Sequence, residues 1–281
     1  MERSLNFDNK KPLLYLVATP IGNLEEMSPR ALSVLKEVDL IACEDTRMTA
    51  KLLSFFNISK PLVSLREHNE VSEAKNVVEK ILKGSKIAYV SDAGYPCISD
   101  PGAKLVQIAL ENDINVSTIS GPSAFINALV ASGLNSDHFY FYGFLSAKQS
   151  ERKAELEELS NLKTTIIFYE SPHRIKKTLE DMLCVLGNRK MTLARELTKK
   201  HEEFIRSDIK SISELDEDTL IGEMVLVVEG KKNDDVKIDE SQIKNEVDEL
   251  VKKGLSSKDA IKLISEKYKL NKNLVYKIYL N

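Results

Sequence analysis

The 281-residue sequence predicts an α/β protein with a mainly parallel sheet, a second α+β region and a short helical segment at its C-terminal end. Two observations support this class. Short apolar runs of strand length alternate with helical patterns, as expected when helices connect parallel strands. Several runs end in loops rich in glycine, proline and small polar residues, the place where open α/β sheets bind ligands.

Composition is that of an ordinary soluble protein, with 42% hydrophobic residues, 30% charged residues and a net charge of −3. The three cysteines, Cys43, Cys97 and Cys184, are scattered without a CxxC pair, which argues against a disulfide framework or a zinc site. The histidines show no ligand spacing, so no metal is expected. The polar N-terminus and the lack of an apolar run of ~18 residues predict a cytoplasmic protein without a membrane span.

The first strand is expected at residues 13–18, where continuous apolar residues suit a sheet covered by helices on both faces. Ser28-Pro29 combines a cap residue with proline at the first helical position and so predicts the start of a helix. Each of the next two strands, at 39–43 and 61–65, ends in a charged cluster and is followed by a helix. The clusters are Glu44-Asp-Thr-Arg47 and Arg66-Glu-His-Asn69, and the helices are expected at about 49–56 and 71–83.

We expect the chain to be organised around the loop that follows a buried strand at 87–90. This loop, 91–102, contains two prolines, two glycines and two aspartates, whereas a plain connection has ~2–6 residues. Asp100-Pro101 predicts the cap and first position of the next helix. A strand at 116–119 and the turn Ser120-Gly-Pro-Ser-Ala124 lead into a helix ending near Gly133. The three loops at 19–24, 91–102 and 120–124 are interpreted as walls of one pocket.

A change in amino-acid composition near residue 139 predicts a domain boundary. An aromatic run at 139–144 is followed by a polar, basic stretch, and we place the N-terminal domain at 12–138 and a second domain at 139–231. Further elements are expected in this second domain: helices at 151–162 and up to Gly187, strands at 164–169, 191–195 and 224–229, and a short segment at 211–216.

The last part of the chain predicts a small basic helical domain at 240–281, after a charged linker at 231–239. Three short helices are expected at about 241–253, 257–268 and 272–280. Residues 241–281 contain nine lysines and five acidic residues. Two interpretations stay open: a solvated helical cap, or a helix-turn-helix-like unit that binds nucleic acid through lysines such as those at 258, 262, 267, 269, 272 and 277.

The familiar phosphate-binding and hydrolase motifs are missing. There is no GxGxxG, GxxxxGK[ST] or GxSxG sequence, which disfavours a dinucleotide, a triphosphate cradle and a serine-hydrolase triad. A pocket of backbone and small side chains, with Asp92 and Glu170 nearby, suits a compact ligand with hydrogen-bonding edges. From the residues alone, we expect a cytosolic α/β enzyme that binds a small ligand.

Eight motifs in order make the prediction specific. They are Ala18-Thr-Pro-Ile-Gly-Asn-Leu24, Cys43-Glu-Asp-Thr-Arg47, Glu67-His-Asn69, Ser91-Asp-Ala-Gly-Tyr-Pro96 with Ser99-Asp-Pro-Gly102, Gly121-Pro122, Phe168-Tyr-Glu-Ser-Pro-His-Arg174, Ala194-Arg-Glu-Leu-Thr198 and Gly222-Glu-Met-Val225. Over about residues 12–230 the chain resembles the bacterial small-subunit ribosomal RNA methyltransferase I family, of the tetrapyrrole-methylase-like class. Tyr95 and Cys97 depart from the family pattern, which usually has threonine and an aliphatic residue.

The resemblance implies two α/β domains, with S-adenosylmethionine (SAM) in the cleft between them, and a small C-terminal helical segment. It implies 2′-O-ribose methylation of a cytidine in the decoding region of 16S rRNA within the small ribosomal subunit, by a homodimer in the cytoplasm. The cofactor contacts carried over by motif are Pro20, Ala93, Gly94, Tyr95, Ile98, Ser123, Ala124, Glu170 and Leu197.

Catalysis is expected at Glu44, Asp45, Arg47 and Glu170, which follow strand ends facing the predicted cleft. The base that takes the hydroxyl proton stays open among Glu44, Asp45, His68, Glu170, Glu196 and Lys199. Arg47, Arg174 and Arg195 are expected either to hold RNA phosphates or to pair with these carboxylates. A second basic cluster that could face RNA comprises Lys148, Arg152, Lys153, Arg174, Lys176 and Lys177.

Two other functions are considered. The first is a tetrapyrrole C-methylase or another small-molecule methylase of the same fold. Such enzymes usually have a glycine-rich turn where this chain has Thr19-Pro-Ile-Gly-Asn23, and they lack the EDTR and FYESPHR motifs. The second is a non-catalytic RNA-binding assembly factor that retains a SAM pocket.

Overall fold

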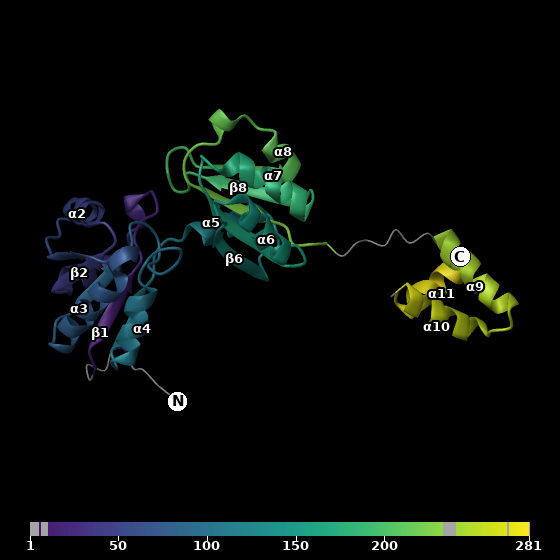
Figure 1. The fold of residues 1–281 in the computed structure, drawn as a ribbon, viewed down its shortest axis with the longest axis horizontal. Coiled ribbons are helices and arrows are strands. Elements are labelled where there is room, and N and C mark those ends of the chain that lie inside the picture. Colours follow the sequence, from purple (N-terminus) through teal and green to yellow (C-terminus); the bar gives the residue numbers. More distant parts are fainter. Residues whose placement is uncertain (1–5, 7–10, 233–239, 269, 281) are drawn as a thin grey trace. The chain divides into compact units, whose positions relative to one another are not determined.

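The computed structural model describes residue 6 and residues 11–232, 240–268 and 270–280, which belong to two compact units divided after Lys231 (Figure 1). Most of the expected linker, residues 233–239, lies outside the described part, as does Lys269. Among the helices of the described residues, none is long and apolar enough to cross a bilayer.

The first sheet is wholly parallel, with strand order β3-β2-β4-β1-β5. Its strands are β1 (Leu13–Val17), β2 (Leu40–Cys43), β3 (Leu62–Ser64), β4 (Ile87–Val90) and β5 (Asn115–Ile119). This topology confirms the parallel α/β prediction. It also places the loops after β1, β4 and β5 next to one another, because neighbouring parallel strands end at the same edge of a sheet.

Helices cover both faces of this sheet, as the continuous apolar strands predict. One face packs against α3 (Glu70–Leu82) and α4 (Ala103–Glu111), around the buried Tyr89. The other face packs against α1 (Pro29–Glu37) and α2 (Thr46–Phe55), around Ile41. Ser28 caps α1 as expected, through a hydrogen bond from the amide of Ala31 to its hydroxyl oxygen. Helix α2 begins three residues earlier than expected, because Asp45 caps it.

The second sheet is mixed, with strand order β6-β7-β10-β8-β9. Only β6 and β7 are parallel; the other neighbours are antiparallel. The strands are β6 (Phe139–Phe144), β7 (Thr165–Glu170), β8 (Lys190–Arg195), β9 (Glu203–Asp208) and β10 (Met224–Val228). The sequence did not predict β6 and β9. Both are partly exposed edge strands: β6 is an aromatic run interrupted by Gly143, and β9 contains three charged residues.

Both faces of the second sheet are covered by helices. The main core packs the sheet against α6 (Gln149–Leu159), α7 (Ile175–Leu186) and α8 (Ile209–Ser213). Helix α5 (Ala124–Ser132) precedes residue 139, yet Ala128 and Leu129 pack on the opposite face of the second sheet. The division into domains at residues 138 and 139 stays a prediction.

The second unit confirms the expected helical segment. It contains α9 (Glu240–Lys252), α10 (Ser257–Lys267) and α11 (Lys272–Leu280). These helices share a small apolar core of their own, which includes Val247, Ile261 and Val275. An apolar face at helical spacing is enough to bring three short helices together.

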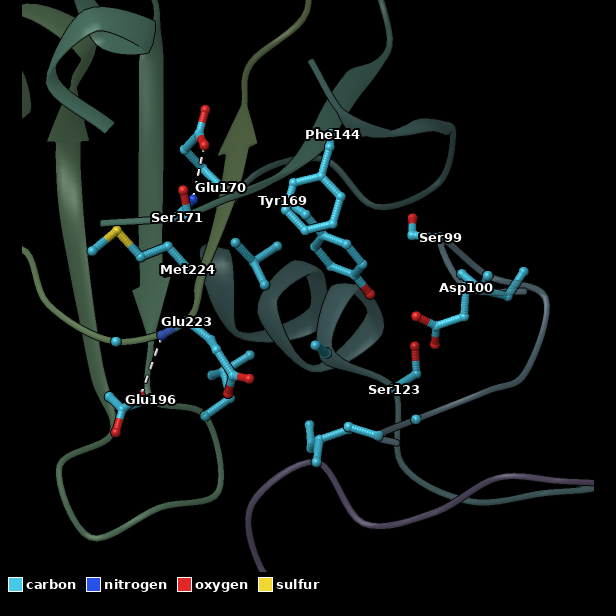
Figure 2. A pocket seen from close by; sticks show the side chains of 18 of the residues that line it. Ser99, Asp100, Ser123, Phe144, Tyr169, Glu170, Ser171, Glu196, Glu223 and Met224 are labelled. Atoms are coloured by element: carbon cyan, nitrogen blue, oxygen red, sulfur yellow. Dashed lines mark hydrogen bonds between the residues drawn. The ribbon is translucent and has the colours of Figure 1, made fainter. Parts of the chain in front are cut away.

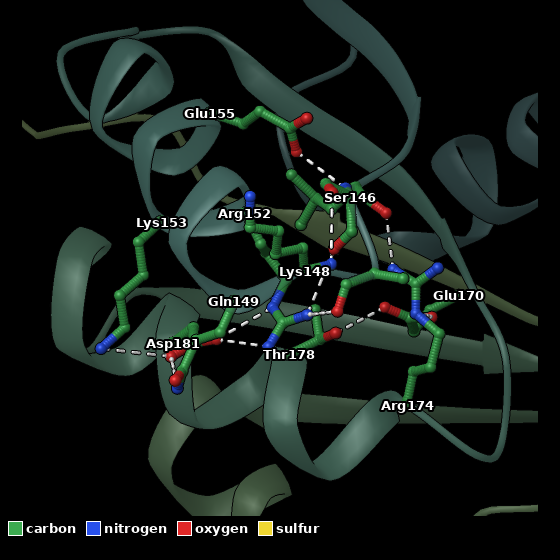
Figure 3. Close-up of polar contacts among 12 residues, drawn as sticks. Ser146, Lys148, Gln149, Arg152, Lys153, Glu155, Glu170, Arg174, Thr178 and Asp181 are labelled. Carbon is green, nitrogen blue, oxygen red and sulfur yellow. Dashed lines mark hydrogen bonds and ion pairs between the residues drawn. The ribbon is translucent and has the colours of Figure 1, made fainter.

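A buried ion pair ties α6 to α7 (Figure 3). The Arg152 guanidinium lies 2.6 Å from an Asp181 carboxylate oxygen, and each side chain is 3% exposed. Arg152 also donates hydrogen bonds to the carbonyl oxygens of Ser146 and Ala147. Burial alone would raise the pKa of Asp181, but hydrogen bonds from Arg152 and Gln149 lower it below its ordinary value.

The basic cluster expected to face RNA is therefore mostly committed to partners within the protein. Arg152 and Lys153 pair with Asp181, and Lys148 pairs with Glu151. Arg174 pairs with Glu170, and Lys176 donates a hydrogen bond to the carbonyl oxygen of Ser213. The third arginine at a strand end, Arg195, pairs with Glu203, which is not among the carboxylates expected to pair with it.

Replacing Asp181 with Asn leaves the Arg152 guanidinium buried without its counterion. Breaking a buried pair in this way costs about 3–5 kcal/mol. We expect Asp181→Asn to lower the free energy of unfolding by an amount in this range, measured by urea denaturation. The matched control is Glu79→Gln, which breaks the exposed pair with Lys83; such pairs contribute about 0–1 kcal/mol. Equal losses in the two variants would contradict this role of the buried pair.

Candidate functional site

The loop after β4 is held against the loop after β1 by backbone pairing. The amide of Thr19 donates to the carbonyl oxygen of Gly94 at 2.9 Å, and the amide of Gly94 donates to that of Thr19 at 3.0 Å. The Thr19 hydroxyl also donates to the carbonyl oxygen of Ser91. Gly94 has a φ of +75°, a conformation that favours glycine. The first two predicted walls are thus joined at Gly94.

The third predicted wall, the loop at 120–124, contacts the other two. The amide of Gly121 donates to the hydroxyl oxygen of Tyr95 at 3.3 Å. A Cβ on Gly121 would lie 2.9 Å from the Cβ of Ala18, so only glycine permits this approach to the end of β1. The three loops predicted to form one pocket therefore contact one another.

The prediction that Asp100 caps α4 is wrong. The cap position is Gly102, with a φ of +124°, and no side chain of its own caps the helix. Instead, a carboxylate oxygen of Glu70 on α3 accepts hydrogen bonds from the amides of Gly102, at 2.9 Å, and Lys104, at 2.8 Å. The Tyr89 hydroxyl donates to the carbonyl oxygen of Pro101. The Asp100 carboxylate is consequently free of the helix end.

A cavity of about 550 Å³ opens between this loop and the second sheet (Figure 2). Eight of the nine residues predicted to bind cofactor line it: Ala93, Gly94, Tyr95, Ile98, Ser123, Ala124, Glu170 and Leu197. Pro20 is not among the lining residues, although its neighbour Ile21 is. We call this space the first cavity.

The first cavity is mainly apolar with a polar rim. Phe144 and Tyr169 contribute aromatic rings, which lie near the centre of Figure 2. Burial raises the pKa of Tyr169 to about 12, so its hydroxyl stays protonated. On the far wall, Lys199 lies 2.9 Å from a carboxylate oxygen of Glu196 and 2.7 Å from one of Glu223. This network lowers the pKa of Glu196.

Glu170 lines the first cavity, but its carboxylate already has three partners. It accepts hydrogen bonds from the Thr178 hydroxyl at 2.6 Å and from the amide of Ser171 at 2.8 Å. The Arg174 guanidinium lies 3.4 Å away, and the Glu170 side chain is 1% exposed. Figure 3 shows Thr178 and Arg174 beside it. These contacts suit a group that holds the end of β7 in place.

A second cavity, of about 600 Å³, adjoins the first. It is rich in acidic residues; its titratable lining residues are Glu44, Asp45, Arg66, Glu67, His68, Glu70, Asp92 and Asp100. Ser99 and Asp100 line both cavities. The amide of Asp45 donates to the Asp92 carboxylate at 3.2 Å, which connects the ends of β2 and β4.

Burial raises the pKa of several carboxylates here. It is the largest cause of the raised pKa of Glu44, followed by the charges of Asp100 and Asp92. Burial likewise raises the pKa of Asp92. For Asp100, burial and the charge of Asp92 outweigh a hydrogen bond from Ser91, and the pKa rises to about 6. A carboxylate of this kind can exchange a proton near neutral pH.

Asp45 and Arg47 behave differently, because they pair with each other. Asp45 accepts hydrogen bonds from the backbone amide and the guanidinium of Arg47. These bonds hold the pKa of Asp45 far below its usual range, so it is a poor proton acceptor. The Arg47 side chain is 81% exposed and does not line either cavity. Of the four predicted catalytic residues, Glu44 and Asp45 share the second cavity, and Glu170 lies at the first.

The sequence did not predict that Asp100 lies at the cavities and not at the start of a helix. Asp100 belongs to the motif that guided the prediction, but the proline after it was interpreted as a helix start. The signal that could have corrected this is Gly102, which suits a cap position but offers no capping side chain. Glu223 was also missed, since nothing in its sequence context links it to Lys199.

Comparison with known proteins places these features in a family. The sequence model of the Tetrapyrrole (Corrin/Porphyrin) Methylases matches residues 13–213. Uroporphyrin-III-C-methyltransferase from Thermus thermophilus has a similar fold, with a TM-score of 0.56 and 17% identity over 78% of this chain and 94% of that one. At this identity the likeness concerns the fold alone.

Two curated relatives match almost the whole length. A protein of Bacillus subtilis named ribosomal RNA small subunit methyltransferase I is 45% identical over 287 residues, covering 99% of this chain and 98% of the relative. A Vibrio cholerae protein of the same name is 47% identical over 277 residues, covering 96% and 94%.

Proposed function

We propose that this chain, which belongs to the ribosomal RNA small subunit methyltransferase I family within the tetrapyrrole methylases, methylates the ribose 2′-hydroxyl of a cytidine in 16S rRNA, using SAM. The observation that carries the proposal is a cofactor-sized cavity lined by the family's motifs, in a chain related to these methyltransferases over nearly its full length. We expect the target to lie in the decoding region of the small subunit, and the protein to act in the cytoplasm.

The first cavity fits SAM in size and chemistry. Its volume lies within the ~300–1,000 Å³ usual for small-ligand sites. Backbone groups of 93–95 offer hydrogen-bonding edges, while Ile98, Leu197 and Val225 offer apolar surface for an adenine ring. The faces of Phe144 and Tyr169 suit a positively charged sulfur. When bound, SAM supplies a methyl group on such a sulfonium.

We propose that the second cavity receives the target nucleotide. Carboxylates such as Glu44 accept hydrogen bonds from the exocyclic amine of cytosine and from ribose hydroxyls. They repel phosphate groups, which leaves the phosphates to Arg66 and to the exposed Arg47. In this arrangement the ribose reaches the methyl donor at Ser99 and Asp100, where the cavities meet. The catalytic assignments of Glu44, Asp45, Arg47 and Glu170 stay predictions.

We also propose a homodimer. Edge strand β6 exposes large apolar side chains away from the first cavity's lining, among them Phe139 at 40% and Tyr140 at 46%, and Val130 on α5 is 71% exposed. Such a surface is typical of an interface between protein chains.

The proposed activity is tested by methyl transfer. We expect the protein to transfer labelled methyl from SAM to 16S rRNA in unmodified 30S subunits, with the label on a cytidine 2′-oxygen after nuclease digestion and mass spectrometry. Uroporphyrinogen should stay unlabelled. Label on the porphyrinogen alone would support the small-molecule methylase, and label on neither substrate would support an assembly factor.

SAM binding is tested at Gly94. Valine there would strain a backbone with a φ of +75° and add a branched side chain beside the cavity. We expect Gly94→Val to weaken SAM binding at least tenfold by calorimetry, which corresponds to about 1.4 kcal/mol. The control is Gly84→Val, at a φ of +98° with no other atoms within 4 Å of the added Cβ. Unchanged affinity in Gly94→Val would remove this loop from the cofactor site.

RNA binding by the second unit is tested by removing charge. Four lysines on α10 and α11 are exposed: Lys258, Lys262, Lys272 and Lys277. Each phosphate contact that releases counterions adds about 0.7–0.9 to the salt slope of affinity. We expect the four lysine-to-glutamine changes to weaken binding to 30S subunits and flatten its salt dependence, with SAM affinity unchanged.

A matched control neutralises four exposed lysines elsewhere, Lys51, Lys75, Lys80 and Lys83. This control should keep the parent salt slope. If both variants lose slope equally, the second unit has no special role in RNA binding. If neither loses slope, these helices serve another purpose, such as packing or dimerisation.

A further inference from the structure

The position of Asp100 singles it out among the acidic residues of the site. Asp100 and Ser99 are the residues that line both cavities. In Figure 2 the Asp100 carboxylate is turned toward the Ser123 hydroxyl, on the loop side of the first cavity. The charge of Asp100 also contributes to the raised pKa of Tyr169, which places the two groups within electrostatic reach. Asp100 therefore lies at the boundary that the two cavities share.

Unlike several acidic residues near it, Asp100 neither caps a helix nor pairs with an arginine. Glu70, not Asp100, caps α4. Asp45 and Glu170 pair with Arg47 and Arg174. No arginine, lysine or histidine of the described residues forms an ion pair with Asp100, and a hydrogen bond from Ser91 is the side-chain interaction that lowers its pKa. Its carboxylate is therefore available to accept a proton from a bound group.

The charges around Asp100 favour a proton acceptor that works near neutral pH. Acidic groups face it from its own loop, from the end of β2 and from the start of α3. The titratable groups that line the second cavity with it are Asp92, Glu44, Asp45, Glu67, Glu70, Arg66 and His68. Tyr89, Cys97 and Tyr169 also lie within its electrostatic reach. Across the first cavity, Lys199 is neutralised by Glu196 and Glu223.

We propose that Asp100 is the catalytic residue that accepts the proton of the ribose 2′-hydroxyl, a role that rests on the methyl transfer proposed above. The 2′-oxygen forms a bond to the methyl carbon while the bond from that carbon to sulfur breaks, its electron pair remaining on sulfur. The hydroxyl proton passes to a carboxylate oxygen of Asp100. The proton then leaves to solvent through the second cavity, which returns Asp100 to its ionised form.

The test compares Asp100→Asn with the parent protein in single-turnover methylation of 30S subunits at saturating SAM. A base must be ionised, so the parent rate should rise with pH up to about 6, the pKa of Asp100, and then level off. Asp100→Asn should lose this rise and react roughly 100-fold more slowly or worse. Its SAM affinity by calorimetry should stay within about threefold, since asparagine keeps the size of the side chain.

Asp92→Asn is the matched control, because it removes a charge beside Asp100 without removing the proposed base. The charge of Asp92 raises the pKa of Asp100, so this variant should keep the rise in rate and move it to lower pH. Carbon-13 NMR of the cofactor-free protein gives an independent measurement. The Asp100 carboxyl signal should titrate near pH 6 in the parent and at lower pH in Asp92→Asn.

The outcomes separate this inference from the proposed function. If the parent methylates 16S rRNA and Asp100→Asn keeps the parent rate or its pH profile, Asp100 is not the base, while the proposed function stands. If the parent transfers no methyl to RNA, the proposed function fails. If Asp100→Asn does not fold, the NMR titration decides. An Asp100 signal that does not titrate between about pH 5 and 7 overturns the inference.

Discussion

The site depends on one capping interaction, the carboxylate of Glu70 on the amides of Gly102 and Lys104. The first amides of a helix have no partners within the helix and need an acceptor from elsewhere. Glu70 provides that acceptor from α3, across the face of the first sheet. The loop between β4 and α4 is thereby anchored at its far end, as the pairing of Gly94 with Thr19 anchors its near end. Asp100, between these anchors, remains available for chemistry.

The same loop separates two environments with opposite chemistry. On one side lie aromatic rings, apolar side chains and backbone groups, which suit the proposed cofactor. On the other side lie carboxylates whose pKa values are raised by burial and by one another, including Glu44 and Asp92. Where a carboxylate has a cationic partner, as Asp45 has Arg47, the pKa moves the other way. Acidic residues that pair with a cation therefore hold the structure in place, whereas those without a cationic partner can exchange protons.

Some charged side chains of the second domain form ion pairs inside the core, and others lie on the surface. The basic stretch at 148–153 looks like a nucleic-acid contact in the sequence, yet Arg152 neutralises Asp181 inside the core. Replacing either partner of such a buried ion pair destabilises the protein, because the other charge stays buried without a counterion. The exposed lysines of α10 and α11 have few such partners in the described part of the chain, apart from the pair between Lys267 and Glu246. We therefore propose phosphate contacts at these lysines.

The sequence by itself determined the parallel first sheet, the helical C-terminal segment and the loops that line the first cavity. Such features depend on local signals: apolar periodicity, and the glycines and prolines that a turn requires. It did not identify the edge strands β6 and β9, because the aromatic run of β6 was interpreted as a domain boundary and charged residues interrupt the apolar positions of β9.

Only the tertiary structure decided the partners of the charged residues. Glu70 meets the start of α4 across 32 positions of the chain, and Arg152 meets Asp181 across 29. A local pattern therefore assigned the cap to Asp100 and RNA contact to Arg152. Gly102 marks the cap position locally, but the carboxylate that caps the helix, and the one left free to accept a proton, are decided by packing between elements distant in the chain.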